Sequence, residues 1–180
     1  MKFIVGIGNP EKKYDGTRHN IGFEALDALR AILGRREDVL LIKPDTYVNR
    51  TGDSVSKLCR KYTASPSDFL FVCDDVNLAF GKMRLRASGG AGGHHGLESV
   101  IAAFGSEDFA RLRIGVGNET MPKDDLSEFV LGKFDRVENG MLEEILGKAA
   151  SVCDTWVGEG LKPAMDRLSK LQSNQQGVNE

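Results

Sequence analysis

The sequence is poor in the residues that build disulfide-bonded, redox and membrane proteins. Its three cysteines, Cys59, Cys73 and Cys153, stand far apart and in odd number among 180 residues. This spacing excludes a Cys-x-x-Cys metal or redox site and is typical of a reducing cytosol. The first apolar run, Phe3–Ile7, is too short for a signal peptide, and no later run is long enough to span a membrane. We therefore expect a cytoplasmic protein without membrane contact.

Several motifs of nucleotide and hydrolytic chemistry are also missing. The sequence has no phosphate-binding Gly-x-x-x-x-Gly-Lys-Ser/Thr loop and no Gly-x-Ser-x-Gly nucleophile elbow. Gly6 and Gly8 begin a dinucleotide-binding pattern, but Glu11 stands where that pattern needs its third glycine. His94 and His95 are adjacent, so their side chains would diverge on a strand or helix, and no third ligand stands at metal spacing. The sequence predicts neither a cofactor nor a metal.

Charge is divided unevenly along the chain. The formal net charge is −2, from 24 basic and 26 acidic side chains. Residues 124–180 carry 6 basic and 11 acidic side chains, whereas residues 1–123 carry 18 and 15. We expect any polyanionic partner to bind the N-terminal two-thirds of the chain.

The apolar periodicity predicts alternating strands and helices in a single domain, residues 1–171, followed by a disordered polar tail, residues 172–180. The predicted strands are Lys2–Ile7, Val39–Ile42, Phe69–Cys73, Lys82–Arg86 and Arg111–Val116. The predicted helices are Ile21–Leu33, Thr51–Tyr62, Leu97–Phe104, Pro122–Leu131, Val137–Val157 and a last one that ends near Leu171. This alternation indicates an α/β fold, a three-layer sandwich in which helices flank a twisted, mostly parallel mixed sheet.

The three histidines of the chain all stand near glycine-rich turns, and Asp74 directly follows the strand predicted to be central. A neutral histidine held by an aspartate can take a proton from water near pH 7, and an asparagine amide can donate to a developing oxyanion. These residue types favour attack by water on an activated acyl group, such as an ester. Structural roles stay open for each of them: His19 as a helix cap, His94 and His95 as turn residues, and Asp74 as a turn cap.

The chain resembles the bacterial peptidyl-tRNA hydrolases, which cleave the ester between a stalled peptide and tRNA. The matching stretches follow one another in order across nearly the whole chain. They are Val5–Pro10, Tyr14, Thr17–Phe23, Lys43–Asn49, Asp74–Asp75, Gly89–Leu97, Arg111–Gly117 and Phe129–Leu131. Each stretch alone is a weak signal, but the ordered set is specific.

The resemblance implies roles for particular residues. His19 would be the general base that activates water, and Asp74 would hydrogen-bond this histidine. Asn9 and Asn49 would hold the peptide and ester carbonyl region, and His94 would lie near the 3′ end of the tRNA. Further substrate contacts are expected from Tyr14, Tyr47 and His95.

The tRNA is expected to bind through its phosphates and its shape, as RNA duplexes usually do. The candidate residues are Lys82, Arg84, Arg86, Arg111 and Arg113. The segment Pro122–Leu131 resembles the family's lid over the cleft. We expect a monomer, since no long apolar stripe is left over once the predicted helices are packed.

Two departures from the family pattern affect these expectations. The family's Gly-Gly-His-Asn-Gly loop has His95 in place of the asparagine, so a titrating side chain enters the site. The connection Gly34–Asp38 is shorter than the family's segment, so we expect a smaller sheet at that edge.

Two other functions stay open from the sequence. One is a non-catalytic RNA-binding relative of the same fold, which the joint presence of His19, Asp74, Asn9 and Asn49 disfavours. The other is a small acyl-ester hydrolase that does not bind RNA, which the arginine-bearing strands disfavour.

Overall fold

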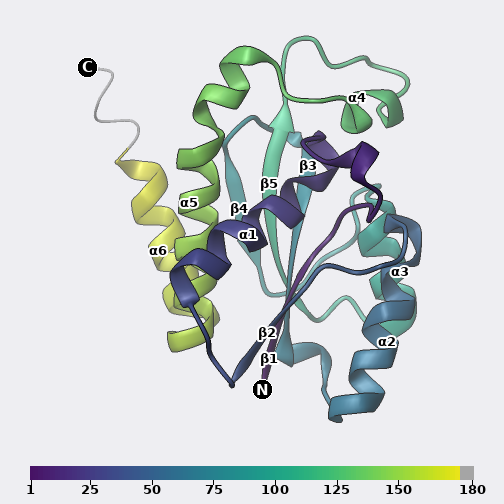
Figure 1. Ribbon diagram of the computed structural model, residues 1–180, viewed down its shortest axis with the longest axis vertical. Coiled ribbons are helices and arrows are strands. Elements are labelled where there is room, and N and C mark those ends of the chain that lie inside the picture. The colour runs from purple at the N-terminus through teal and green to yellow at the C-terminus, as the bar shows by residue number, and fades with distance from the viewer. Residues whose placement is uncertain (175–180) are drawn as a thin grey trace.

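The computed structural model describes residues 1–174, and within them five strands form one sheet in the order β2-β1-β3-β5-β4 (Figure 1). The strands are β1 (Lys2–Gly6), β2 (Val39–Ile42), β3 (Phe69–Ala79), β4 (Met83–Arg86) and β5 (Ala110–Gly117). The pairs β1–β2, β1–β3 and β3–β5 are parallel, and β4 runs antiparallel to β5. The prediction of a mostly parallel mixed sheet is therefore confirmed, with β3 at its centre and β2 at one edge.

Helices cover both faces of this sheet (Figure 1). On one face lie α1 (Ile21–Leu33), α5 (Arg136–Glu159) and α6 (Leu161–Ser173). On the other lie α2 (Thr51–Tyr62) and α3 (His95–Phe104), while the short α4 (Ser127–Leu131) stands beyond one end of the strands. The predicted three-layer sandwich is confirmed. None of the helices within residues 1–174 has the length and apolar character that a membrane crossing requires.

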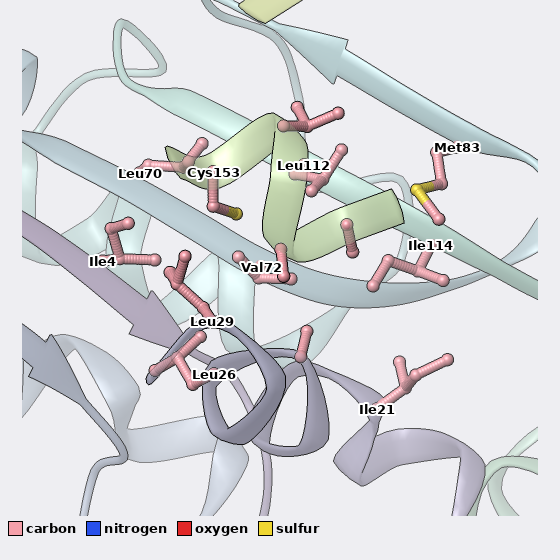
Figure 2. Close-up of a cluster of buried hydrophobic side chains, with 14 of the residues drawn as sticks. Ile4, Ile21, Leu26, Leu29, Leu70, Val72, Met83, Leu112, Ile114 and Cys153 are labelled. Atoms are coloured by element: carbon pink, nitrogen blue, oxygen red, sulfur yellow. The ribbon is translucent and has the colours of Figure 1, made fainter. Parts of the chain in front are cut away.

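Alternating side chains of the strands divide the core in two. Val72 and Leu112 point toward α1 and α5 and pack with Leu29 and Cys153 (Figure 2). The residues that alternate with Val72 along β3, such as Phe71, belong to the second core beneath α2 and α3. Because successive side chains of a strand point to opposite faces, the apolar run of β3 is buried on both sides. This double burial anchors the strand that carries Asp74.

The strand β3 is longer than the sequence predicted. It continues beyond Asp74 to Ala79, so the expectation that Asp74 ends the strand is wrong. Pairing with β1 stops at Val72, but β5 continues alongside with a register shift between Asp75 and Ala79. Gly115 permits this close pairing, since a Cβ there would lie 2.1 Å from the Ala79 carbonyl oxygen. Asp74 therefore lies just beyond the end of β1, with β5 still paired on its other side.

The predicted helix boundaries also need correction at the lid and at the end of the chain. In the predicted lid Pro122–Leu131 only the last five residues, α4, are helical. The last helix continues through Gln172, whose side-chain amide exchanges two hydrogen bonds with the main chain of Met83. The predicted tail therefore begins too early at residue 172, and residues 175–180 lie outside the described part of the chain.

Candidate active site

A pocket of about 900 Å³ opens beyond the end of β1, beside β3 and the segment 124–131 that contains α4. Eight of the predicted site residues line it. They are Asn9, His19, Tyr47, Asn49, Asp74, His94, His95 and Arg113. The fold therefore gathers these residues from six separate stretches of the sequence into one cavity.

The centre of the pocket wall is a hydrogen-bonded trio. The Oδ1 atom of Asp74 lies 2.8 Å from Nδ1 of His19 and 2.9 Å from Nε2 of His94. The side chains of Asp74 and His94 are 3% and 6% exposed, whereas that of His19 is 14% exposed. Two imidazoles thus share one oxygen of a buried carboxylate, and His19 is the more accessible of the two.

The backbone of α3 determines the tautomer of His94. His94 is the N-cap residue of α3, and its Nδ1 accepts hydrogen bonds from the N–H groups of Gly96 (3.1 Å) and Leu97 (3.4 Å). Because Nδ1 accepts, the ring proton is on Nε2, which donates to Asp74. His19 also donates to Asp74, through Nδ1, so its Nε2 keeps a lone pair. His19 is therefore the imidazole of the trio with an available basic nitrogen.

Charge and burial oppose each other in this trio. Burial would lower the pKa of His19, but the charge of Asp74 and their hydrogen bond raise this pKa above its ordinary value of 6.5. Burial would raise the pKa of Asp74, but its electrostatic interactions and hydrogen bonds with the two histidines hold this pKa well below its usual range. Asp74 stays ionised at neutral pH, so it can stabilise a proton that arrives on His19.

The same three side chains are close enough to suggest a metal site. One ligand atom from each of His19, Asp74 and His94 lies within 4.8 Å of the other two. Spacing along the chain did not predict this grouping, because the three residues are far apart in the sequence and meet only in the folded protein. A metal on Nε2 of His94 would displace the proton there and force Nδ1 to give up its two backbone donors. The geometry therefore fits a hydrogen-bonded trio better than a metal centre.

Asn9 is oriented by two neighbours. Its backbone exchanges hydrogen bonds of 2.9 Å with the side chain of Asn20, in both directions. Its own Oδ1 accepts from the N–H of Val48 at 3.0 Å. The side-chain NH₂ of Asn9 is the group left for a substrate, and it can only donate. Asn20 is a supporting residue that the sequence analysis did not single out, although it directly follows His19.

Two tyrosines and an asparagine extend the site toward its mouth. Tyr47 is 46% exposed and lines the pocket, and its ring meets that of Tyr14 edge-on, with 6.5 Å between centroids. Tyr14 itself is not part of the pocket wall but packs behind Tyr47. Asn49, in the 3₁₀-helix η3 (Val48–Arg50), is exposed at the pocket.

The prediction of Arg111 as a tRNA contact is wrong. Arg111 is 1% exposed, and its guanidinium lies 4.0 Å from the ring centre of Phe109. It donates to the main-chain carbonyls of Gly89, Glu107 and Phe109. The residue type alone suggested a phosphate contact, but the glycine loop folds over that position. Arg111 supports this loop from beneath.

Arg113 contacts the glycine loop and also lines the pocket. Its Nη2 donates to the carbonyls of Gly90 (2.7 Å) and Ala91 (3.0 Å), and its Nη1 lies 3.5 Å from a carboxylate oxygen of Asp75. The side chain is 11% exposed and lines the pocket. Arg113 therefore holds the loop that leads to His94 while presenting part of its charge to the cavity.

The remaining basic candidates and His95 are on the surface. Lys82, Arg84 and Arg86 are exposed, and Arg84 and Arg86 pair in register with Arg113 and Arg111 across the β4–β5 ladder. These residues form a basic strand edge beside the glycine loop. The side chain of His95 is 76% exposed at the pocket, where its Nδ1 lies 2.9 Å from Oε2 of Glu98.

Comparison with known proteins identifies the family of the chain. The family model described as peptidyl-tRNA hydrolase matches residues 3–176. Peptidyl-tRNA hydrolases from Desulforudis audaxviator and Chlorobium phaeovibrioides are 45% and 42% identical to the chain; both alignments cover 94% of it, and 93% and 98% of those proteins. The crystal structure of peptidyl-tRNA hydrolase from Acinetobacter baumannii superposes with a TM-score of 0.85 at 31% identity, covering 93% of this chain and 94% of that one. The chain therefore belongs to the peptidyl-tRNA hydrolase family.

Proposed function

We propose that the protein hydrolyses the ester bond that joins a peptide, or an N-blocked aminoacyl group, to tRNA. The observation that carries this proposal is the fixed pair of tautomers around Asp74, which leaves Nε2 of His19 as a free base on a pocket wall. Membership of the family supports the substrate class. A protein that only bound RNA would have no need of a buried carboxylate to hold a water-activating histidine, so the non-catalytic alternative is not favoured.

In the proposed reaction, Nε2 of His19 takes a proton from water as the water oxygen attacks the ester carbonyl carbon. The ionised Asp74 stabilises the imidazolium that forms. The side-chain NH₂ of Asn9 donates to the carbonyl oxygen as it becomes anionic, and the proton on His19 passes to the leaving ribose oxygen. The new C–O bond to water replaces the ester bond, and the products are a peptide carboxylic acid, which loses its proton to solvent, and a tRNA with a free 3′-terminal hydroxyl.

The pocket suits a substrate whose peptide varies in sequence. We propose that Tyr47, Asn49 and His95 contact the substrate around the ester, with Tyr14 supporting Tyr47. Amide and hydroxyl groups bind a peptide main chain without reading its side chains. His94 acts through Asp74 rather than on the substrate directly, since both of its ring nitrogens are already engaged.

We propose that the tRNA backbone binds the exposed basic edge formed by Lys82, Arg84 and Arg86, with Arg113 at the border of the pocket. We also propose that the protein acts as a cytoplasmic monomer. Among the described residues, exposed large apolar side chains such as Ile32 and Tyr62 are on different helices, and Val137 and Met141, one turn apart on α5, form a pair rather than a long stripe. Light scattering after size-exclusion chromatography tests the monomer.

The test of the function is release of N-acetylated aminoacyl groups from bulk tRNA by the purified protein, with unblocked aminoacyl-tRNA as the control. We expect release from the N-blocked substrate and a loss of about 100-fold or more in His19→Ala, since general-base contributions are of that size. The variant should still bind tRNA. Binding of tRNA without any release by the natural sequence would refute the hydrolase and leave an RNA-binding protein.

A further inference from the structure

A buried ion pair lies next to the proposed active site but outside the pocket. Nη2 of Arg18 donates to Oε2 of Glu138 at 2.7 Å, and the two side chains are 8% and 7% exposed. Neither residue lines the pocket. Burying two charges costs more free energy than a surface pair, and apolar residues of similar size often serve stability as well. This pair therefore calls for an explanation beyond stability.

Arg18 holds the chain just after α4. Its Nη1 donates to the carbonyl of Lys133 at 2.7 Å, and its guanidinium lies 4.4 Å from the ring centre of Phe129 and 5.4 Å from that of Phe134. Its backbone N–H donates to the carbonyl of Gly132 at 3.0 Å. Nε of Arg18 is buried without an acceptor among the described residues, so the position is not optimised for stability alone.

Glu138 joins the two ends of residues 119–134, which we call the lid segment. Its Oε1 accepts from the side chain of Asn118 at 2.6 Å, immediately after β5. Its Oε2 accepts from the backbone of Asp135 at 2.8 Å, in a capping box at the start of α5. The chain between these two contacts, residues 119–134, contains the part of the pocket wall formed by residues 124–131. One carboxylate thus fixes both ends of that wall.

Both partners lie close to the proposed base in the chain or in space. Arg18 directly precedes His19 within the 3₁₀-helix η2 (Arg18–Asn20). The isolated bridge between Thr17 and Lys133 ties the same turn to the lid segment. Any shift of the lid segment relative to Glu138 therefore pulls on the turn that carries His19.

We propose that Arg18 and Glu138 are positioning residues of the reaction, which hold the lid segment 119–134 in register with His19. The proposal rests on the proposed hydrolase for its effect on rate. It does not require either side chain to touch the substrate. Their loss should lower kcat, since the water, His19 and the ester would no longer be aligned, and should leave tRNA affinity unchanged because the basic edge of β4 is untouched.

The test compares Glu138→Gln with Arg18→Lys. The lysine keeps the positive charge, but it lacks the planar guanidinium that contacts Lys133 and Glu138 at the same time. We expect kcat to fall about 10- to 100-fold in Glu138→Gln, and less in Arg18→Lys, at temperatures where both are folded. The inhibition constant of deacylated tRNA should change less than twofold. Arg36→Met, which breaks the exposed Arg36–Asp38 pair far from the pocket, is the matched control and should leave both constants unchanged.

Amide hydrogen exchange supplies a readout that needs no turnover. We expect faster exchange across residues 119–134 in Glu138→Gln, with unchanged exchange in the central strand β3. Unchanged kcat, or unchanged exchange of this segment in the folded variants, would overturn the proposal. If the natural sequence releases no product at all, the proposed hydrolase activity is refuted. The exchange experiment then still tests whether Arg18 and Glu138 hold the lid segment 119–134.

Discussion

At the scale of single residues, the site depends on one oxygen atom, Oδ1 of Asp74. The pairing of Asp74 with His19 could be expected from the residue types and the family resemblance. The second donor, His94, could not, because its role depends on a helix cap that fixes which ring nitrogen carries the proton. The burial of Arg111 was equally hidden, since strand alternation does not show that a loop folds over one face.

The raised pKa of His19 predicts the behaviour of Asp74→Asn. Only the neutral imidazole acts as a base, so the rate rises with pH through the pKa of His19. Asp74 raises that pKa, and its removal should therefore move the acid limb of kcat/KM to lower pH. The plateau should fall by about 10²- to 10⁴-fold, because the imidazolium loses its stabilising charge. A pH–rate profile measures both effects. An acid limb that stays at the same pH, or moves to higher pH, would contradict the prediction.

His95 predicts a second, separable effect of pH. This imidazole is exposed beside Glu98 at the pocket and lies outside the hydrogen-bonded trio of Asp74. We expect the acid limb of the natural sequence to be steeper than that of His95→Asn. Glu98→Gln serves as the control for the ion pair. If the natural sequence and His95→Asn have the same acid limb, His95 does not influence the reaction.

At the scale of elements, the boundaries that the sequence missed are those set by contacts between strands. The polar pair Asp74–Asp75 interrupts the apolar run and predicts a strand end, but the glycines of β5 let the partner strand continue. α3 begins two residues earlier than its apolar period indicates, because the cap is a histidine rather than one of the usual short polar residues. The layers themselves followed from periodicity, which reports burial directly.

The double role of His94 can be separated by substitution. Asparagine is a good N-cap, so His94→Asn should keep α3 capped and cost less than about 1 kcal/mol in the free energy of unfolding, while His94→Ala should cost about 1–2 kcal/mol. Both should lower kcat, since neither side chain reaches Asp74 as the imidazole does. Denaturant melts and turnover assays check the two readouts. Full activity in His94→Asn would show that the second donor to Asp74 is dispensable.

At the scale of the whole molecule, charge is spread unevenly over the elements. Basic side chains gather on and beside β4, whereas the acidic excess of the C-terminal third lies in the segment 124–131 and in α5. The division along the chain follows from the sequence. That Arg111 is buried beneath the glycine loop while Arg84 and Arg86 are exposed does not.

This arrangement predicts different outcomes for arginines that the sequence grouped together. Arg84→Glu with Arg86→Glu should raise KM and flatten its dependence on salt, because fewer counterions are released when tRNA binds. Arg111→Lys should instead lower the unfolding temperature and kcat with little change in the salt slope. Kinetics between low and physiological salt distinguish the two. An unchanged KM in the double variant would remove both arginines from the tRNA surface.

The hydrogen bonds between Gln172 and Met83 protect the molecule against edge-to-edge aggregation. Both main-chain groups of Met83 that face away from β5 are taken by one side-chain amide, which imitates a neighbouring strand. An open strand edge is a template for aggregation, and here the last turn of α6 closes it. Deleting the chain from Gln172 onward would thus expose the edge of β4 at Met83 to pairing with another copy, while leaving every active-site residue in place.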